Sequence, residues 1–352
     1  MDTPHEITFP TPLVNADGRL NPHAIGWMRQ PLIDTSGIKS SSRWGRNKRW
    51  EYWCILTPEH LLALTVSSLD YAGVYEVWVH ERATGKSWGK TAIAPLPLLK
   101  IPKNLGQGNI DLTQRRLSIG IHESQEGTRL RARIPGAAFE VFVPLPPDHE
   151  RLGVVVPWSR DLFQYTVKDL GRPARGWVMC DRTATRFSDD SWAVLDHGRG
   201  RWPREVEWNW GTANGEVSGW KILFDRDYLA SHPDAREYTY RLGIQFGAKW
   251  TDGSGVTENS VFFDGHIYKI HDDVTLTYDL DNPLEPWRIV GGGLDLTLKP
   301  FHNKQSRTDV KYVASRTDQL FGTYSGVVTI PGVGTMMVTD LIGFAEDVMQ
   351  RW

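Results

Sequence analysis

This chain of 352 residues has few cysteines and no excess of positive charge. Its two cysteines, Cys54 and Cys180, lie far apart in the sequence. Two distant cysteines exclude a disulfide-rich scaffold and a cysteine-based metal site. They could form one disulfide, but we expect free buried thiols in a reducing cytoplasm. Lys and Arg number 40 against 42 Asp and Glu, for a formal net charge of -2. This balance argues against a nucleic-acid-binding surface.

Long hydrophobic runs are also missing. No apolar stretch approaches the roughly 20 residues that a transmembrane helix needs. Residues 1–20 lack the basic start and the apolar run of a secretory signal. We therefore expect a cytoplasmic protein, monomeric or homodimeric, with no integral membrane segment.

The signatures of common cofactor and nucleophile sites do not occur either. The sequence contains no glycine-rich phosphate loop, no dinucleotide-binding fingerprint and no nucleophile elbow. His266 and His271 lie five residues apart across a turn, which is too weak a pattern for a metal site. The sequence therefore predicts neither a cofactor nor a metal.

Helical periodicity is scarce, whereas short β-rich segments bounded by turn residues are frequent. Asp-Gly pairs at 252–253 and 264–265 favour hairpins. Only residues 225–230 and 344–350 fit short helices. The expected strands fall within residues 53–66, 71–80, 117–121, 129–134, 139–143, 177–180, 238–247, 260–270, 274–278, 294–300 and 323–330. This pattern predicts an all-β chain with antiparallel sandwich or barrel architecture.

Tryptophan is the residue in excess, with 16 copies spread from Trp27 to Trp352. Its large apolar body and single donor suit the walls of ligand cavities as well as protein cores. Basic-aromatic blocks at 44–53 and 200–210 each precede a set of predicted strands. This echo predicts two tandem barrel domains, residues 1–200 and 201–352.

The densest group of reactive side chains begins at Asp196 and His197 and runs to Trp210. An acid or an imidazole beside an apolar cavity can have its pKa moved toward neutrality, which suits general acid work. Asp196 and His197 are therefore catalytic candidates. The structural alternative is an Asp196 that pairs with Arg199 or Arg201 and holds a turn.

Three tryptophans, Trp202, Trp208 and Trp210, complete this stretch. Side chains two residues apart share one face of a strand, so Trp208 and Trp210 would form an aromatic wall with Asn209 on the other face. Such a wall packs a hydrocarbon or stabilises a carbocation. The alternative is that these rings fill a barrel core.

Glu258 follows a glycine-rich turn and enters the apolar strand 261–263. An acid at this place is costly unless it is paired or protonated, so Glu258 is the third catalytic candidate. Asn259 could orient a carbonyl group or a water molecule. The structural alternative is a salt bridge from Glu258 to an arginine of the segment 199–204.

Alternation across residues 164–168 places Lys168 where it could bind a carboxylate, although a solvated lysine is the ordinary outcome. Glu51 lies among aromatic residues in the first basic-aromatic block. The substrate-binding candidates, besides the three tryptophans and Asn259, are Glu51, Trp53, Tyr165, Lys168, Arg199 and Arg201.

Two strings in the sequence resemble the DUF2804 family of bacterial and fungal proteins. They are Asp-x-x-Arg-Gly-x-Trp-Pro at 196–203 and Trp-Thr-Asp-Gly-x-Gly-x-Thr-Glu-Asn at 250–259. Shorter matches at 48–53, 164–168 and 208–210 extend the resemblance over most of the chain. More distantly, the chain is similar to lipocalin-like proteins of the hydroxyneurosporene synthase (carotenoid 1,2-hydratase) and AttH type. The resemblance implies two tandem lipocalin-like antiparallel β-barrels with short helices and a cofactor-free pocket for an apolar ligand.

Together, these features predict a cofactor-free acid/base enzyme, either a hydratase, an isomerase or a cyclase. Its substrate would be a hydrophobic terpenoid- or polyketide-like small molecule in an aromatic-lined pocket. Asp196 or Glu258 would protonate an alkene or a carbonyl group, and the tryptophans would stabilise the positive charge that develops. The alternative is a non-catalytic lipocalin-like carrier of a lipid or another hydrophobic ligand. A glycosidase using Asp196 and Glu258 is a third hypothesis.

Overall fold

A computed structural model describes the chain except for residues 1–3, 40, 96–98, 100, 311–312 and 352. The chain divides into two compact units, one formed by His5–Trp202 and one containing Pro203–Trp352. Among the described residues, helix is confined to α1 (Arg226–Ser231) and three short 3-10 helices. Strands make up most of the rest, which confirms the predicted all-β class.

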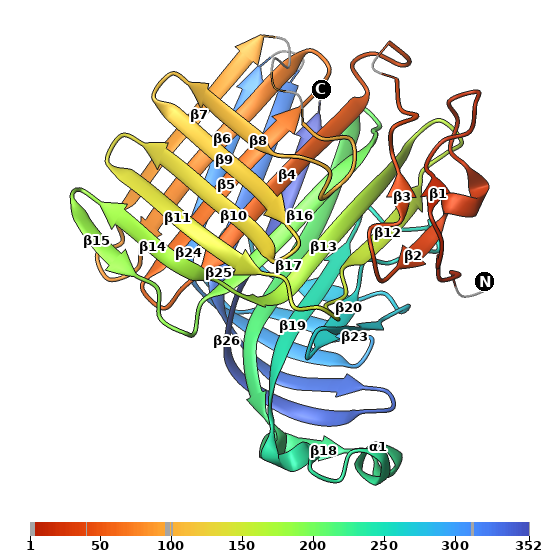
Figure 1. Cartoon of the computed structure of the whole chain (residues 1–352), viewed down its shortest axis with the longest axis vertical. Helices are drawn as coiled ribbons and strands as arrows, with labels where there is room; N and C mark the ends of the chain where they lie inside the picture. The colour runs from red at the N-terminus through yellow and green to blue at the C-terminus, as the bar shows by residue number, and fades with distance from the viewer. Residues whose placement is uncertain (1–3, 40, 96–98, 100, 311–312, 352) are drawn as a thin grey trace. The chain divides into compact units, whose positions relative to one another are not determined.

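Two sheets face each other in the unit His5–Trp202, and the smaller covers one face of the larger (Figure 1). The larger sheet has the order β2-β12-β13-β16-β4-β5-β6-β7. Its strands are β2 (Gly26–Met28), β4 (Asn47–Leu56), β5 (His60–Ser68), β6 (Ala72–Glu81), β7 (Ser87–Pro95), β12 (Leu152–Pro157), β13 (Phe163–Pro173) and β16 (Trp192–Arg201). The smaller sheet, in the order β15-β14-β11-β10-β9-β8, contains β8 (Ile110–Gln114), β9 (Leu117–Ser124), β10 (Gly127–Ile134), β11 (Ala137–Pro144), β14 (Arg175–Cys180) and β15 (Thr183–Arg186). Two short parallel strands, β1 (Thr11–Pro12) and β3 (Ile33–Asp34), pair separately.

The apolar core of this unit lies between the two sheets. Alternate residues such as Trp53 and Leu64 from the larger sheet meet Ile121 and Leu130 from the smaller one, and all four are buried. Full burial of such a side chain stabilises the fold by roughly 1.5–3 kcal/mol. The period-two alternation that burial imposes also fixes which other side chains point inward.

The unit containing Pro203–Trp352 is built on one ten-stranded sheet, as far as its described residues show. The strand order is β21-β20-β19-β17-β26-β25-β24-β23-β22, with β18 paired to β26. The strands are β17 (Glu205–Ser218), β18 (Ile222–Phe224), β19 (Thr239–Ala248), β20 (Ser260–Phe263), β21 (His266–Lys269), β22 (Thr275–Thr277), β23 (Trp287–Gly291), β24 (Leu294–Val310), β25 (Val313–Ile330) and β26 (Gly334–Arg351). Its core includes the fully buried Leu242, Leu296 and Leu320.

One of the two helix predictions is confirmed and the other is wrong. The helix expected over residues 225–230 is α1. Residues 344–350 belong instead to β26, which pairs with both β17 and β25 along this stretch. Pairing on both sides outweighs the weak local preference of so short a segment.

The expectation for the two cysteines is confirmed. Cys54 and Cys180 are both buried free thiols, as predicted. Within the residues that the structure describes, no helix is both long enough and apolar enough to cross a membrane. Closure of the sheets into two tandem lipocalin-like barrels stays a prediction.

Candidate functional site

Polar side chains occupy one end of the interior of the unit His5–Trp202. On β4, Arg49 and Glu51 precede the core residue Trp53 at intervals of two. On β16, Arg199 stands directly opposite Arg49, and His197 directly opposite Glu51. Because side chains alternate along a strand and cross-strand partners share a face, all five point to the interior.

Glu51 and His197 form a buried carboxylate–imidazole pair. Their exposed fractions are 5% and 1%. The Nδ1 atom of His197 lies 3.6 Å from Oε2 of Glu51, and the indole of Trp53 donates to Oε1 of Glu51 at 2.9 Å. Neither ring nitrogen of His197 has a hydrogen-bond partner among the described residues. Since an unpaired buried polar group costs about 1–3 kcal/mol, a ligand that bonds to this imidazole would recover that energy.

A second carboxyl group, which the sequence analysis missed, lies near this pair. Glu123 in β9 follows the core residue Ile121 by two positions, so its side chain also points inward. Burial raises the pKa of Glu123, and the neighbouring Glu51 raises it further. The hydroxyl of Thr128 donates to both of its oxygens at 3.1 Å. A carboxyl group with a raised pKa beside another carboxyl group suits proton exchange.

A buried ionic network adjoins Trp53. Asp169 accepts from Nε2 of His149 and from Nη1 of Arg172, both at 2.7 Å. Arg172 also donates to two backbone carbonyls of β11, and its guanidinium lies 5.9 Å from the centre of the Trp53 ring. Burial opposes the ionisation of Asp169, but Arg172 and His149 hold its pKa below the ordinary value. This network supports the ring that holds Glu51.

A cavity of about 1010 Å³ is present in this unit, and its lining includes Arg49 and Arg199. Arg199 is the one predicted site residue found in the described lining. The charged side chains that line the cavity are Lys39, Lys48, Arg49, Asp70, Lys103 and Arg199. Burial lowers the pKa of Lys48 to about 8. The cavity is therefore mainly cationic among its described residues.

Tyr165 and Arg201 also belong to the inward face of the larger sheet. Tyr165 stands opposite Arg199 and is 2% exposed, and its burial raises the pKa of the phenol. Arg201 donates to Oδ1 of Asn47 at 3.1 Å and to the carbonyl of Gly18. These contacts fix Arg201 in the wall of the interior.

Asp196 lies on the opposite face of the larger sheet. Its Oδ1 accepts from the Thr166 hydroxyl at 2.8 Å and lies 3.1 Å from Nζ of Lys168. Its Oδ2 accepts from the indole of Trp50 at 2.9 Å. Asp196 is thus paired with Lys168. The alternative partners, Arg199 and Arg201, face the interior on the other side of the sheet. Lys168 is buried, so the alternative of a solvated lysine is wrong.

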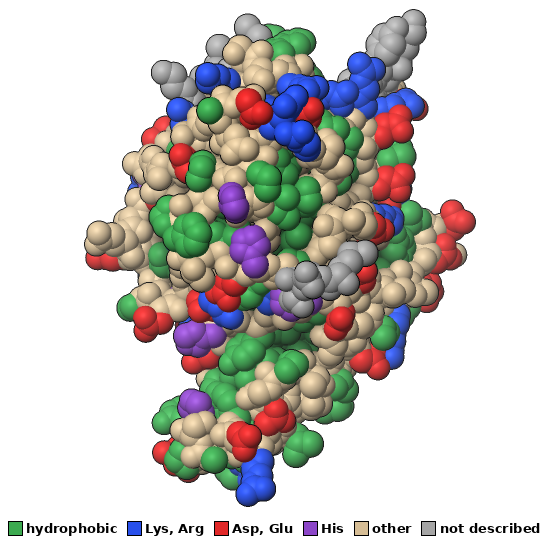
Figure 2. All heavy atoms as spheres, turned by 90° about the vertical axis from the view of Figure 1, so that its right-hand side faces the viewer, with side chains coloured by type: hydrophobic (Ala, Val, Ile, Leu, Met, Phe, Trp, Pro, Cys, Tyr) green, Lys and Arg blue, Asp and Glu red, His purple; other side chains and the backbone are tan. Residues whose placement is uncertain are grey.

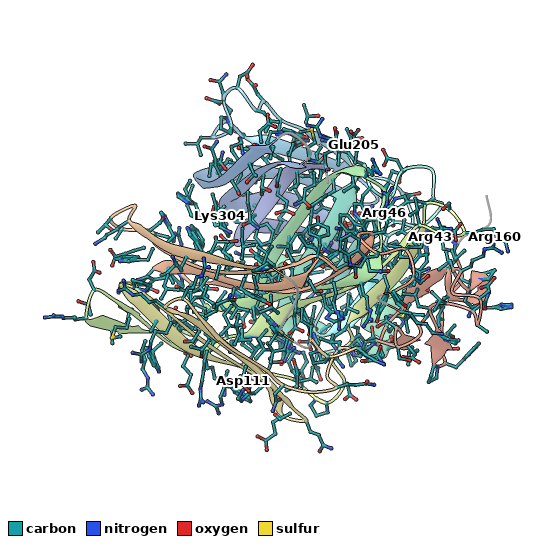
Figure 3. The ribbon with its side chains drawn as sticks, turned by 90° about the horizontal axis from the view of Figure 1, so that it is seen from above. Arg43, Arg46, Asp111, Arg160, Glu205 and Lys304 are labelled. Carbon is teal, nitrogen blue, oxygen red and sulfur yellow. The ribbon has the colours of Figure 1, made fainter. Side chains whose placement is uncertain are left out.

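We expect Asp196→Asn to lower the free energy of unfolding by about 3 kcal/mol, because Lys168 loses its buried counter-charge. Chemical denaturation measures this, with Asp111→Asn as the matched control. Asp111 carries a side chain that is 74% exposed and lies on the outside of the smaller sheet (Figure 3). Its loss should cost less than about 0.5 kcal/mol. Unchanged stability with lost turnover would instead support the predicted role of Asp196 as an acid.

An aromatic cluster packs on the same face as Asp196. The indole of Trp202 donates to Oε1 of Gln164 at 2.6 Å. Its ring meets Trp50 and Trp158 edge-on, at centroid distances of 5.2 and 5.7 Å. Gly198 makes room for this cluster, because a Cβ there would lie 2.1 Å from the Trp50 ring.

In the unit containing Pro203–Trp352, Glu258 closes a chain of indole and amide hydrogen bonds. Trp210 donates to Gln245 at 2.9 Å, and Gln245 donates to Oε2 of Glu258 at 3.2 Å. Trp250 donates to Oε1 of Glu258 at 2.6 Å. Burial lowers the pKa of Lys269 to about 7, against the opposing effect of Glu258. The predicted role of Glu258 as an acid stays a prediction.

Trp208 and Trp210 lie on the face of β17 opposite this unit's apolar core. Trp208 donates to Oε1 of Glu346 at 2.8 Å, and Trp210 packs edge-on against Phe344 at 4.9 Å. Asn209 lies on the core-facing side, where its amide donates to Oδ2 of Asp347 at 3.1 Å. Trp210 and Phe344 are both buried, so an aromatic wall for a ligand at this place stays a prediction.

Asn259 connects neighbouring backbone segments. Its Oδ1 accepts from the amide N–H of Gly247 at 2.9 Å, and its Nδ2 donates to the carbonyl of Asp272 at 2.9 Å.

Within the part of the chain that the structure describes, no group of three or more His, Cys, Asp or Glu residues could hold a metal ion. The predicted site residues thus fall into three places, and the interior of the unit His5–Trp202 collects the largest set: Glu51, Trp53, Tyr165, His197, Arg199 and Arg201.

Comparison with known proteins gives structural likeness at low identity. An AttH protein from Nitrosomonas europaea is 11% identical with a TM-score of 0.48, covering 86% of this chain and 92% of that chain. Kievitone hydratase from Nectria haematococca is 10% identical with a TM-score of 0.47, covering 99% and 97%. CghA is 9% identical with a TM-score of 0.39, covering 87% and 88%. No curated protein matches the chain.

A family model gives the firmer result. The model described as "Domain of unknown function (DUF2804)" matches residues 4–352. The match covers nearly the whole sequence and confirms the resemblance seen in its motifs. The chain therefore belongs to the DUF2804 family.

Proposed function

We propose that the unit His5–Trp202 is an acid/base enzyme that moves protons on a small organic molecule through Glu51 and His197. The observation that carries this proposal is the buried imidazole of His197, which has no hydrogen-bond partner among the described residues and lies 3.6 Å from a carboxylate. Unsatisfied buried polar groups are typical of functional sites, and Arg49 and Arg199, which line the cavity, lie two positions from Glu51 and His197 on the same strands.

The geometry gives each group a role. Trp53 fixes one oxygen of Glu51, so the other oxygen remains directed at His197. When His197 takes a proton from the substrate, the carboxylate of Glu51 stabilises the imidazolium that forms. Glu123, with its raised pKa, then supplies a proton to a second substrate atom. Hydration, isomerisation and cyclisation all use such a pair of proton transfers.

The proposal includes the finer architecture expected from the sequence. In it, the curled sheets form lipocalin-like barrels, and the interior of the unit His5–Trp202 is the ligand pocket. The apolar side chains that line the cavity would hold the hydrocarbon part of the substrate, and the polar end of the interior would hold its reactive part. A non-catalytic carrier would use the same pocket without proton transfer.

Solvent deuterium reports proton transfer on any compound in a mixture, so the substrate need not be identified beforehand. The protein is incubated in D₂O with a metabolite extract of its own organism, and mass spectrometry then detects carbon-bound deuterium that survives return to H₂O. We expect labelling of at least one compound by the wild type and none by Glu51→Gln or His197→Gln. Native mass spectrometry shows in parallel whether that compound binds to all three proteins.

Two outcomes would contradict the proposal. Binding of a compound without any label by the wild type would identify a carrier. Equal labelling by the wild type and both variants would place the chemistry elsewhere, and Asp196→Asn and Glu258→Gln would then be the next variants to compare.

A further inference from the structure

Arg49 and Arg199 place two guanidinium groups opposite each other beside the cavity of the unit His5–Trp202. Like charges directly opposite on neighbouring strands destabilise a sheet. Their other cross-strand neighbours, Ser68 and Tyr165, carry no charge that could compensate. The direct cross-strand partners therefore supply no counter-charge for this pair, and the nearest carboxylate on this face of the sheet is that of Glu51, two residues from Arg49.

The remaining contacts of the two arginines are with neutral groups. Arg49 donates to the carbonyl of Ile101, and Arg199 donates to the carbonyl of Lys103 at 3.1 Å. Nε of Arg49 is buried without a hydrogen-bond partner. Asp70 acts electrostatically on both guanidinium groups and Asp34 on Arg199, and this attraction only partly offsets the cost of their burial. Burial, followed by the effect of Arg49, lowers the pKa of Arg199 to about 9, which leaves it protonated at neutral pH.

The rest of the cavity combines further cations with apolar walls. Three lysines add positive charge, and Asp70 is the acid found in the described lining. Apolar surface comes from Ile38, Trp44, Leu99, Ile101 and Pro102. A volume of about 1010 Å³ holds a small organic molecule, and this lining matches one with an apolar body and a negative group.

Further arginines surround this end of the unit. Arg43, Arg46 and Arg160 lie at one end of it (Figure 3), and Arg43 pairs with Asp161 at 2.9 Å. Arg46 acts electrostatically on Lys48, which lines the cavity. Figure 2 shows Lys and Arg side chains near the top of one face of the molecule, with Asp and Glu side chains among them. A positive field of this kind concentrates anions.

We propose that Arg49 and Arg199 bind the carboxylate of an organic acid, and that organic acids are the substrate class of the site. This inference rests on the proposed acid/base function of Glu51 and His197. Guanidinium groups match the planar geometry of carboxylates. Arg49 and Glu51 are two residues apart on their strand, as are Arg199 and His197, so the carboxylate and the reacting atom lie about 7 Å apart.

A matched pair of fluorescent probes tests the charge requirement. The anionic probe is 8-anilinonaphthalene-1-sulfonate, and N-phenyl-1-naphthylamine has the same ring system without the sulfonate. We expect Arg49→Gln and Arg199→Gln each to lower the affinity for the anionic probe by about tenfold. Each should leave the affinity for the neutral probe within about twofold of the wild-type value. Decanoate should displace the anionic probe at concentrations at which inorganic phosphate does not.

The control variant is Arg129→Gln, which removes a half-exposed arginine paired with Glu140 on the smaller sheet. It should bind both probes as the wild type does, and thermal unfolding confirms that each variant is folded. Unchanged affinity for the anionic probe in both cavity variants would overturn the proposal. Equal loss of both probes, or displacement by phosphate as effective as by decanoate, would overturn it as well.

Glu51→Gln separates this inference from the proposed function. It should bind the anionic probe within about twofold of the wild type, because the arginines are untouched. If it also keeps full labelling from D₂O while Arg199→Gln loses the probe, the acid/base assignment is wrong and the organic-anion site stands. Lost labelling in Glu51→Gln, with probe binding that does not depend on Arg199, refutes the anion site alone.

Discussion

Glu51→Gln is expected to lower turnover by about 10²–10⁴-fold while the protein remains folded. Glutamine keeps the shape of the side chain and an oxygen that accepts the indole N–H of Trp53, so the local packing persists. It removes the negative charge 3.6 Å from His197, which would otherwise stabilise the imidazolium formed during proton transfer. The measurement is the initial rate of deuterium incorporation, with urea denaturation to verify stability.

Glu140→Gln is the matched control for this result. Glu140 lies in β11 of the same unit, and its carboxylate bonds to Arg129 at the surface. The variant Glu140→Gln should leave the rate of deuterium incorporation unchanged. The double variant Glu51→Gln with His197→Gln should lose little more than the slower single variant, because two groups that act in one step are not additive. A multiplicative loss would show that they act independently.

The fold class followed from the sequence because it depends on local signals. Alternation and Asp-Gly turns indicated strands throughout, and the structure forms strands in those regions. The exception at residues 344–350 has a physical cause. The long strand β26 is paired on one side by β25, the strand that precedes it in the chain, and on the other side by β17, which comes from a distant part of the sequence. The sequence of a short segment does not encode such pairing.

The site was only partly readable, because the sequence does not give the register between strands. Asp196 and His197 are adjacent, yet they face opposite sides of the larger sheet. The pairing of β4 with β16 brings Glu51 against His197 across 146 sequence positions, a contact that no local motif encodes. Glu123 could have been found, because it continues the alternation of Leu117, Ile119 and Ile121 in the core. The two-residue period of the strand places the carboxyl group of Glu123 on the inward face.

Arg172→Met is expected to lower the free energy of unfolding at pH 7 by about 3–5 kcal/mol, because it leaves the buried charge of Asp169 with one partner fewer. Arg172 and His149 lower the folded pKa of Asp169 below its ordinary value of 3.8, so this carboxylate stabilises the fold above pH 3.8 and loses that contribution as the pH falls toward the folded pKa. Without Arg172, protonation of Asp169 at acid pH removes the poorly paired buried charge, so the variant loses less stability there than at pH 7.

The deficit of Arg172→Met should therefore be smaller at pH 4 than at pH 7 in urea denaturation. Arg129→Met, which breaks the half-exposed pair with Glu140, should cost less than about 1 kcal/mol at either pH. A deficit of equal size at both pH values would assign the loss to packing, since the Arg172 guanidinium also lies over the Trp53 ring. A deficit that shrinks with acid assigns it to the charge of Asp169. In either case the variant loses the guanidinium that lies over the Trp53 ring, which positions Glu51, so it should lose turnover as well as stability.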